Sequence, residues 1–169
     1  MFRLKVIAIL ALIALFVGSI ALGDAAAGEK HRTRAVKHLT KWQPVEIPGE
    51  EGRVLASFEQ KGIDTNLGGK SLFDGWLYHV VGLWEVNEKA HVGSGYGYIL
   101  STDPDGDKVY MQWEGKRAQG DLHSRGTGTI VKGMGKWEGI QGKCTWVTTN
   151  PAPGQEYVDV DWDIELPRR

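Results

Sequence analysis

The sequence predicts an all-β protein, built as a single antiparallel barrel of seven to eight strands and preceded by an N-terminal signal helix. Three observations predict this class. From Gly52 onward, apolar and polar residues alternate with a period of two, which is typical of strands that bury one face. Turn residues interrupt this alternation about every eight to twelve positions, and no amphipathic helical pattern is found there. Closing short strands into a barrel removes the exposed edges that they would otherwise present.

The alternation and the turns place each strand in order. In chain order, strands are expected at residues 53–61, 75–87, 91–101, 108–115, 122–132, 141–149 and 158–166, with an eighth if residues 42–47 join the sheet. The last strand is the clearest, because Val158, Val160 and Trp162 alternate with Asp159 and Asp161. It therefore has one apolar and one anionic face.

Glycines gather on particular strand faces. Gly93, Gly95 and Gly97 share one face of the third predicted strand, and Gly126 and Gly128 share one face of the fifth. A face without side chains lets a sheet coil tightly or lets another group approach the backbone. No helix pattern follows these glycines, so we interpret them as architectural rather than as a phosphate-binding loop.

Residues 1–23 have the layout of a secretory signal peptide. Arg3 and Lys5 precede an uncharged apolar run over residues 6–22, and small residues follow it. The alternative is an uncleaved anchor, because about 17 apolar residues approach the length that spans a bilayer. Both interpretations predict that the rest of the chain is secreted or periplasmic.

Residues 24–41 are interpreted as a basic linker, and residues 42–169 as the barrel domain. The linker holds five basic residues between Lys30 and Lys41. It is either a solvated connection or an arm that makes transient contact with a membrane. The whole chain has 20 Lys and Arg against 21 Asp and Glu, a net charge of -1, which excludes a polyelectrolyte that binds nucleic acid.

Two stretches resemble a known group of proteins. One is the motif GSGY at residues 93–96 with the turn DGDK at 105–108, and the other is GTG at 126–128 with GKWEGIQG at 135–142. They resemble small exported bacterial proteins, largely uncharacterised, whose sheets are similar to the allene oxide cyclase and dirigent type of eight-stranded barrel. The resemblance covers about residues 75–149. It implies a calycin-like barrel with an apolar cavity, trimeric in some members. The acidic catalytic residue of the plant cyclases has no match here, so no cyclase activity follows from it.

The aromatic residues are the candidates for a ligand site. If they point into one lumen, they form an apolar pocket with polar indole and phenol groups, as is common in small-molecule sites. The alternative is a barrel core that is filled by its own side chains. The candidate ligand-binding residues are Trp76, Tyr78, Trp84, Trp113 and Trp162.

Catalytic and metal-binding candidates are few. His79 and Glu85 are the candidate acid or base of a reaction in the same cavity. Asp103, Asp105 and Asp107 form either a solvated hairpin turn or a calcium site, although the glycine that a calcium loop requires is misplaced. With a single cysteine there is neither an intramolecular disulfide nor a multi-cysteine metal site. No cofactor is predicted.

Three functions follow, in order of preference. The first is an exported barrel that binds a small apolar or amphipathic ligand in an aromatic-lined cavity, without covalent chemistry. The second is a cyclase or isomerase in that cavity, and the third is a non-enzymatic envelope interaction protein that uses the basic linker. The strand at 75–87 is apolar on both faces, so either residues 42–47 or a second subunit of a dimer or trimer is expected to cover its outside.

Overall fold

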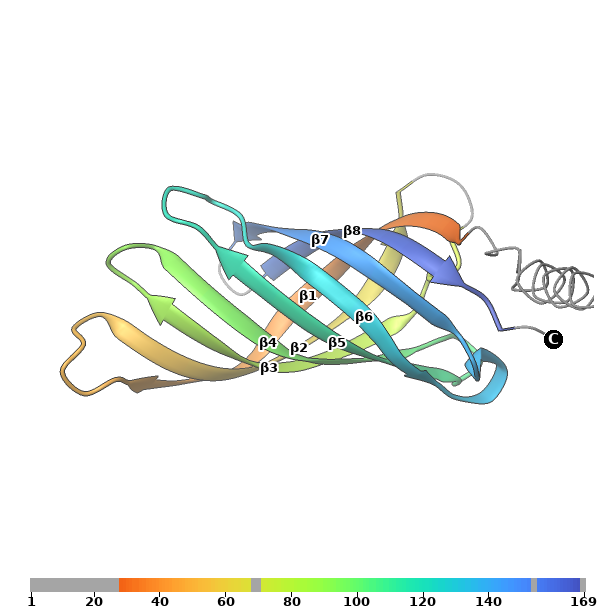
Figure 1. The fold of residues 1–169 in the computed structure, drawn as a ribbon, viewed down its shortest axis with the longest axis horizontal. Helices are drawn as coiled ribbons and strands as arrows, with labels where there is room; N and C mark the ends of the chain where they lie inside the picture. The colour runs from red at the N-terminus through yellow and green to blue at the C-terminus, as the bar shows by residue number, and fades with distance from the viewer. Residues whose placement is uncertain (1–27, 68–70, 153–154, 168–169) are drawn as a thin grey trace, which may run out of the picture.

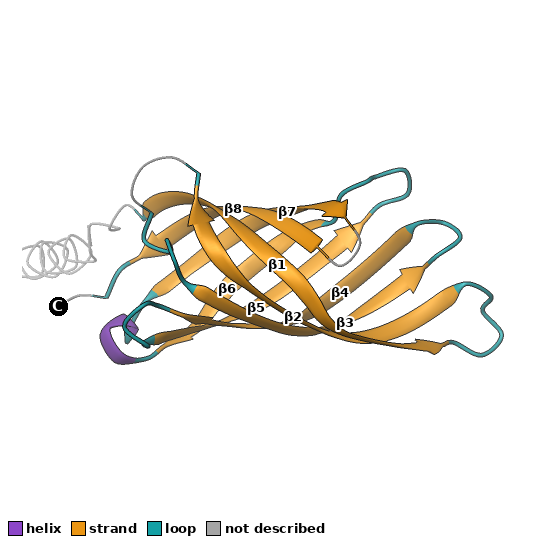
Figure 2. Ribbon diagram, turned by 180° about the vertical axis from the view of Figure 1, so that it is seen from behind, coloured by secondary structure: helices purple, strands orange, loops and turns teal. Residues whose placement is uncertain are grey.

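The computed structural model describes residues 28–67, 71–152 and 155–167, and the predicted signal peptide lies outside these ranges. Eight antiparallel strands form a closed barrel in which every strand pairs with its neighbour in sequence and the last pairs with the first (Figures 1 and 2). The predicted all-β barrel is therefore confirmed. Among the described residues, no helix has the length and apolar character needed to cross a membrane. The elements are β1 (Glu29–Glu46), β2 (Arg53–Asn66), β3 (Leu77–Asn87), β4 (Val92–Thr102), β5 (Lys108–Arg117), β6 (Arg125–Gly133), the short 3-10 helix η1 (Gly135–Trp137), β7 (Gln141–Ala152) and β8 (Gln155–Glu165).

Strand β1 corrects the interpretation of residues 24–41 as a linker. Residues 29–38 pair with β8 and residues 33–46 pair with β2, so the barrel begins at Glu29 and not at residue 42. The inner face of β1 carries Thr33, Ala35 and Lys37, all of them buried. A strand whose inner face is small or polar lacks the apolar alternation that identifies strands in a sequence. This is why the element was missed.

The basic residues of β1 pair with the acidic face of β8. Arg34 makes two hydrogen bonds to Asp159, of 2.6 Å from Nε and 2.8 Å from Nη2. Further along the two strands, Arg32 and Lys30 form ion pairs with Asp161 and Asp163. Opposite charges at facing positions of neighbouring strands stabilise the pairing. Contact of this segment with a membrane stays a prediction, and these three side chains already have partners in the barrel.

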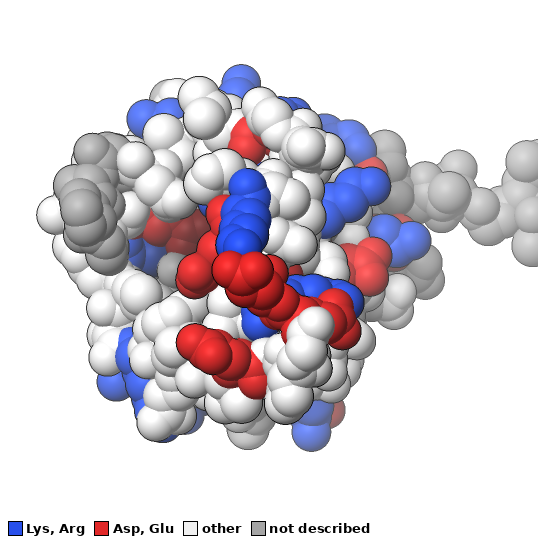
Figure 3. All heavy atoms as spheres, turned by 90° about the vertical axis from the view of Figure 1, so that its left-hand side faces the viewer, with Lys and Arg blue, Asp and Glu red and all other residues white. Residues whose placement is uncertain are grey.

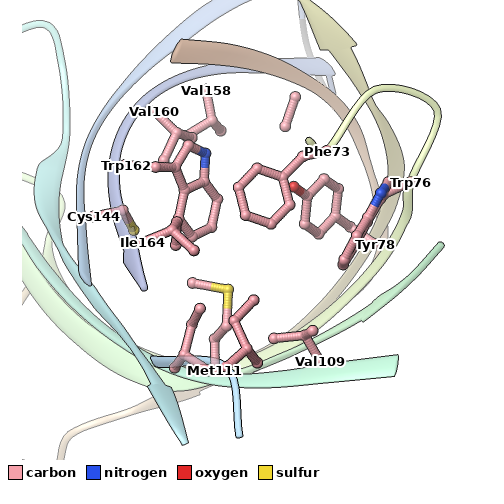
Figure 4. Packing of buried hydrophobic residues seen from close by; sticks show 13 residues of the cluster. Phe73, Trp76, Tyr78, Val109, Met111, Cys144, Val158, Val160, Trp162 and Ile164 are labelled. Atoms are coloured by element: carbon pink, nitrogen blue, oxygen red, sulfur yellow. The ribbon is translucent and has the colours of Figure 1, made fainter. Parts of the chain in front are cut away.

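One end of the barrel is plugged. The loop between β2 and β3 places Phe73 inside the ring of strands, stacked on Trp162 with a centroid distance of 4.3 Å (Figure 4). Hydrogen bonds tie the loop to the end of β2, since Asp64 N–H donates to the carbonyl of Trp76 and Gly75 N–H donates to the carbonyl of Asp64. The hydrophobic core therefore sits at the end of the barrel that carries η1.

The opposite end carries the hairpin turns of β1–β2, β3–β4 and β5–β6 (Figure 1). Residues 42–46 pair with β2 in the plane of the sheet and extend the first hairpin, so the expectation that they cover the outside of β3 is wrong. That outer face exposes Leu77, Val81, Tyr96 and Tyr98 on β3 and β4. A homo-oligomer that covers this face stays a prediction.

Candidate functional site

A cavity of about 820 Å³ occupies the lumen and reaches the hairpin end of the barrel. It exists because the plug loop fills only one end, while the inner faces of the strands continue beyond it. Seven of the eight strands contribute residues to its lining, and the loop before β6 contributes Ser124. Its aromatic lining consists of Trp42, Phe58, Tyr78, Trp84, Trp113, Trp146 and Trp162.

Four of the five predicted ligand-binding residues line this cavity, namely Tyr78, Trp84, Trp113 and Trp162. Trp76 does not. It precedes β3 in the plug loop and packs against Phe73 and Trp137, with ring centroids 5.0 and 5.1 Å away. Parity along a strand predicts which face a residue lies on, but Trp76 lies outside the strand where parity holds.

Three aromatic residues of the cavity were missed. Trp146 has the parity of Cys144 on β7, and both face inward. Trp42 and Phe58 are register partners of β1 and β2, with ring centroids 6.5 Å apart. The alternation on β7 was the signal that could have found Trp146. Trp42 lies in the segment 42–47, which the sequence predicted only as a possible eighth strand.

The inner glycine faces hold the indole rings. A Cβ at Gly95 would overlap the Trp84 ring, and one at Gly126 would overlap the Trp146 ring. Trp84 in turn stacks on Trp113 at 6.1 Å and 26°. The rings thus lie flat against bare backbone instead of pointing across the lumen. The architectural interpretation of the glycines accounts for the open space that remains.

His79 and Glu85 lie outside the lumen, which corrects their role as acid or base in the cavity. They share the outer face of β3, because inner positions on this strand are Tyr78, Val80 and Trp84. His79 Nε2 lies 2.7 Å from Oε1 of Glu59, and Glu85 accepts hydrogen bonds from the Arg53 guanidinium. Both residues form surface pairs between β2 and β3.

The three aspartates of the β4–β5 turn do not converge on a common point. Asp103 Oδ1 accepts hydrogen bonds from the backbone N–H of Asp105 and Asp107, both of 2.9 Å. Lys136 is the cation between them, forming ion pairs with Asp103 and Asp105. Within the described ranges, no group of three or more His, Cys, Asp or Glu side chains has the geometry of a metal site. This geometry is that of a hairpin turn in which Asp103 is buried, and calcium binding by the three aspartates stays a prediction from the sequence.

A buried polar cluster lies at the inner end of the cavity. Tyr78 Oη donates a 2.7 Å hydrogen bond to Oδ2 of Asp64, whose side chain has no exposed surface. Burial raises the pKa of Asp64 to about 6, against the hydrogen bond from Tyr78 that lowers it. Burial also raises the pKa of the Cys144 thiol to about 12. The buried carboxyl group of Asp64 therefore stays protonated up to about pH 6.

Lys37 is the second unusual polar group. It lines the cavity from β1, is only 8% exposed, and places Nζ 5.8 Å from the centroid of the Tyr78 ring. Burial lowers the pKa of its amine, opposed by the negative charge of Glu156 on β8. The sequence pattern assigned Lys37 to a solvated linker, so nothing indicated that it faces inward.

The mouth of the cavity is charged. Figure 3 views the hairpin end and shows acidic side chains gathered there with basic ones among them. In the β1–β2 and β3–β4 hairpins, Arg53 pairs with Glu50 and Glu85, and Lys89 pairs with Glu51. The cavity thus has a charged rim and a mainly apolar, aromatic interior.

Comparison with known proteins supports the fold. No protein-family model and no curated protein sequence matches the chain. Among solved structures, it is similar to a pterocarpan synthase dirigent protein, with a TM-score of 0.54, 9% identity, and coverage of 89% of this chain and 96% of that one. It is also similar to a protein of unknown function from the DUF3224 family of Shewanella oneidensis, with a TM-score of 0.53, 14% identity, and coverage of 82% and 100%. The predicted resemblance to dirigent-type barrels and to uncharacterised bacterial proteins is therefore confirmed at the level of the fold.

Proposed function

We propose that the protein binds a small apolar or amphipathic ligand in the barrel lumen. One observation carries this proposal: the lumen keeps a cavity of about 820 Å³ lined by indole rings instead of filling with side chains. Cavities of about 300–1,000 Å³ with mainly apolar walls and a few polar groups are the usual form of small-molecule sites. Lys37 and Tyr78 provide such polar groups in the lining.

The direct test uses two neighbouring residues on opposite faces of β3. Val80 lines the cavity and is 3% exposed, whereas Val81 is 43% exposed on the outside. Val80→Trp should weaken binding of the neutral fluorescent probe N-phenyl-1-naphthylamine, because the added ring occupies part of the lumen. We expect the affinity to fall at least about tenfold, which corresponds to a loss of about 1.4 kcal/mol of binding free energy. The measurement is a titration of probe emission with energy transfer from the lining tryptophans.

Val81→Trp adds the same ring to the same strand and is the matched control, so it should leave the affinity unchanged. Overpacking costs about 1–3 kcal/mol, so thermal unfolding of both variants checks that they fold. Equal affinity of a folded Val80→Trp variant, or no binding by the unmodified protein, would refute the proposal.

An isomerase or cyclase in the same lumen is the second candidate function. The observation that favours it is the buried Tyr78–Asp64 hydrogen bond, since Asp64 has a pKa of about 6 and could exchange a proton near neutral pH. Asp64 and Tyr78 take the place of His79 and Glu85 as acid-base candidates. Product formation that is lost in a folded Asp64→Asn variant would support this function over simple binding.

Export is part of the proposal and rests on residues 1–23 alone. The basic start, the apolar run and the small residues after it support secretion or periplasmic location. Expression with and without residues 1–23, followed by fractionation, tests it: the protein should leave the cytoplasm only when the segment is present. Equal distribution of the two forms would contradict export.

A further inference from the structure

Lys37 combines deep burial with the lack of a direct partner. Among the described residues, its amine makes neither a side-chain hydrogen bond nor an ion pair, and Nζ lies over the face of the Tyr78 ring, 5.8 Å from its centroid. Burying an unpaired ammonium is costly, so burial favours the neutral amine. A neutral amine in an apolar pocket is a nucleophile, as in enzymes that form Schiff bases with carbonyl substrates.

The groups around Lys37 favour a neutral ligand over an anion. Glu156 on β8 already accepts a hydrogen bond from Gln60, and Asp64 on β2 accepts one from Tyr78 on β3. Two carboxyl groups in the same lumen oppose the entry of a third negative charge. Cys144 on β7 also lines the cavity, but burial raises the pKa of its thiol to about 12 and keeps it protonated.

We propose that Lys37 captures an apolar aldehyde that enters the lumen and binds it covalently as an imine. This inference rests on the proposed function, because the aldehyde must first occupy the cavity. The Nζ lone pair forms a bond to the carbonyl carbon, the π electrons of C=O move to oxygen, and a proton passes from nitrogen to that oxygen. The resulting carbinolamine loses its hydroxyl group and the second nitrogen proton as water. A neutral C=N bond remains, and no oxidant or reductant is consumed.

The test traps this bond. The purified protein is incubated with 6-methoxy-2-naphthaldehyde and sodium cyanoborohydride, which reduces an imine to a stable secondary amine, and peptides are mapped by mass spectrometry. Lys61 on β2 provides the internal comparison, because its side chain is 60% exposed. Label should form at Lys37 at least about tenfold faster than at Lys61, because the cavity holds the aldehyde next to the buried Lys37 amine. Label spread over the lysines without preference for Lys37 would overturn the inference.

Two variants and one matched compound separate the outcomes. Lys37→Met should abolish the fast labelling, and Lys61→Met should leave it unchanged. If Lys37→Met does not fold, the peptide map of the unmodified protein still tests the inference, because it compares labelling at Lys37 and Lys61. The compound 2-methoxynaphthalene has the same ring system without the carbonyl group. If 2-methoxynaphthalene binds but the aldehyde forms no adduct with Lys37, only this inference is overturned. If neither compound binds, the proposed function is overturned as well.

Discussion

At the scale of single residues, the lumen is unusual for the ionisable groups that it buries. Asp64 has no exposed surface, and among the residues that the structure describes its Oδ1 atom makes no hydrogen bond. A buried carboxylate with an unsatisfied oxygen is costly, and the molecule reduces this cost by keeping the carboxyl protonated to a higher pH. The stability of the barrel should therefore depend on pH through this residue.

Asp64→Asn tests this dependence. The folded-state pKa of Asp64 is raised to about 6, so its stabilising contribution is complete below about pH 4 and is lost as the pH rises through 6. Relative to the variant, the unmodified protein should lose about 3 kcal/mol of unfolding free energy over this window. Urea unfolding at several pH values measures it. Asp74→Asn in the exposed part of the plug loop is the control and should keep the slope of the unmodified protein; the same slope in Asp64→Asn would contradict the account.

At the scale of elements, β1 and β8 close the barrel through complementary charges on their outer faces. Arg34 and Asp159 make two hydrogen bonds and are partly buried, whereas Arg32 and Asp161 make a single contact of 3.5 Å with both side chains two-thirds exposed. Geometry and burial decide what such pairs contribute. The two pairs therefore offer a comparison within one strand pairing.

A double-mutant cycle should separate them. The cycle on Arg34→Ala and Asp159→Ala should give a coupling of about 0.5–1 kcal/mol that falls with added salt. The cycle on Arg32→Ala and Asp161→Ala should give a smaller coupling. Both are measured by urea unfolding. A larger coupling for the exposed pair would show that the closure does not depend on the buried, bidentate contact.

The elements also show what the sequence could reveal. Seven of the eight strands follow from alternation and from the turn residues that bound them; β5, with Val109, Met111 and Trp113 buried, is typical. Strand β1 could not be found in this way, because charge pairing and backbone hydrogen bonds hold it rather than apolar burial. The same strand supplies Lys37 and Trp42 to the cavity lining, so the sequence did not predict these two site residues.

Strand parity predicts only part of the site. Parity places Trp84, Trp113 and Trp162 in the lumen once a strand is known, but it does not say which face of β3 is inside. His79 and Glu85 were assigned to the cavity although they have the opposite parity to Trp84. The direction in which a strand faces depends on its partners across the barrel, which no single segment encodes.

At the scale of the whole molecule, the barrel is closed at one end and open at the other. The plug of Phe73 and Trp76 buries the core, and the glycine faces of β4 and β6 leave room above it for flat-lying indoles. A barrel of eight strands has an interior just wide enough for its own side chains, so omitting side chains on two strands converts filled space into a cavity. The open lumen is thus a property of the architecture and not of one residue.

The most direct test of this account is a crystal structure of the protein with 2-bromonaphthalene, located by the anomalous signal of bromine. The account predicts the bromine inside the lumen, within contact of Trp84, Trp113 or Trp146. Bromine found only on the exposed outer face of β3 and β4, or a lumen occupied by the protein's own side chains, would contradict it.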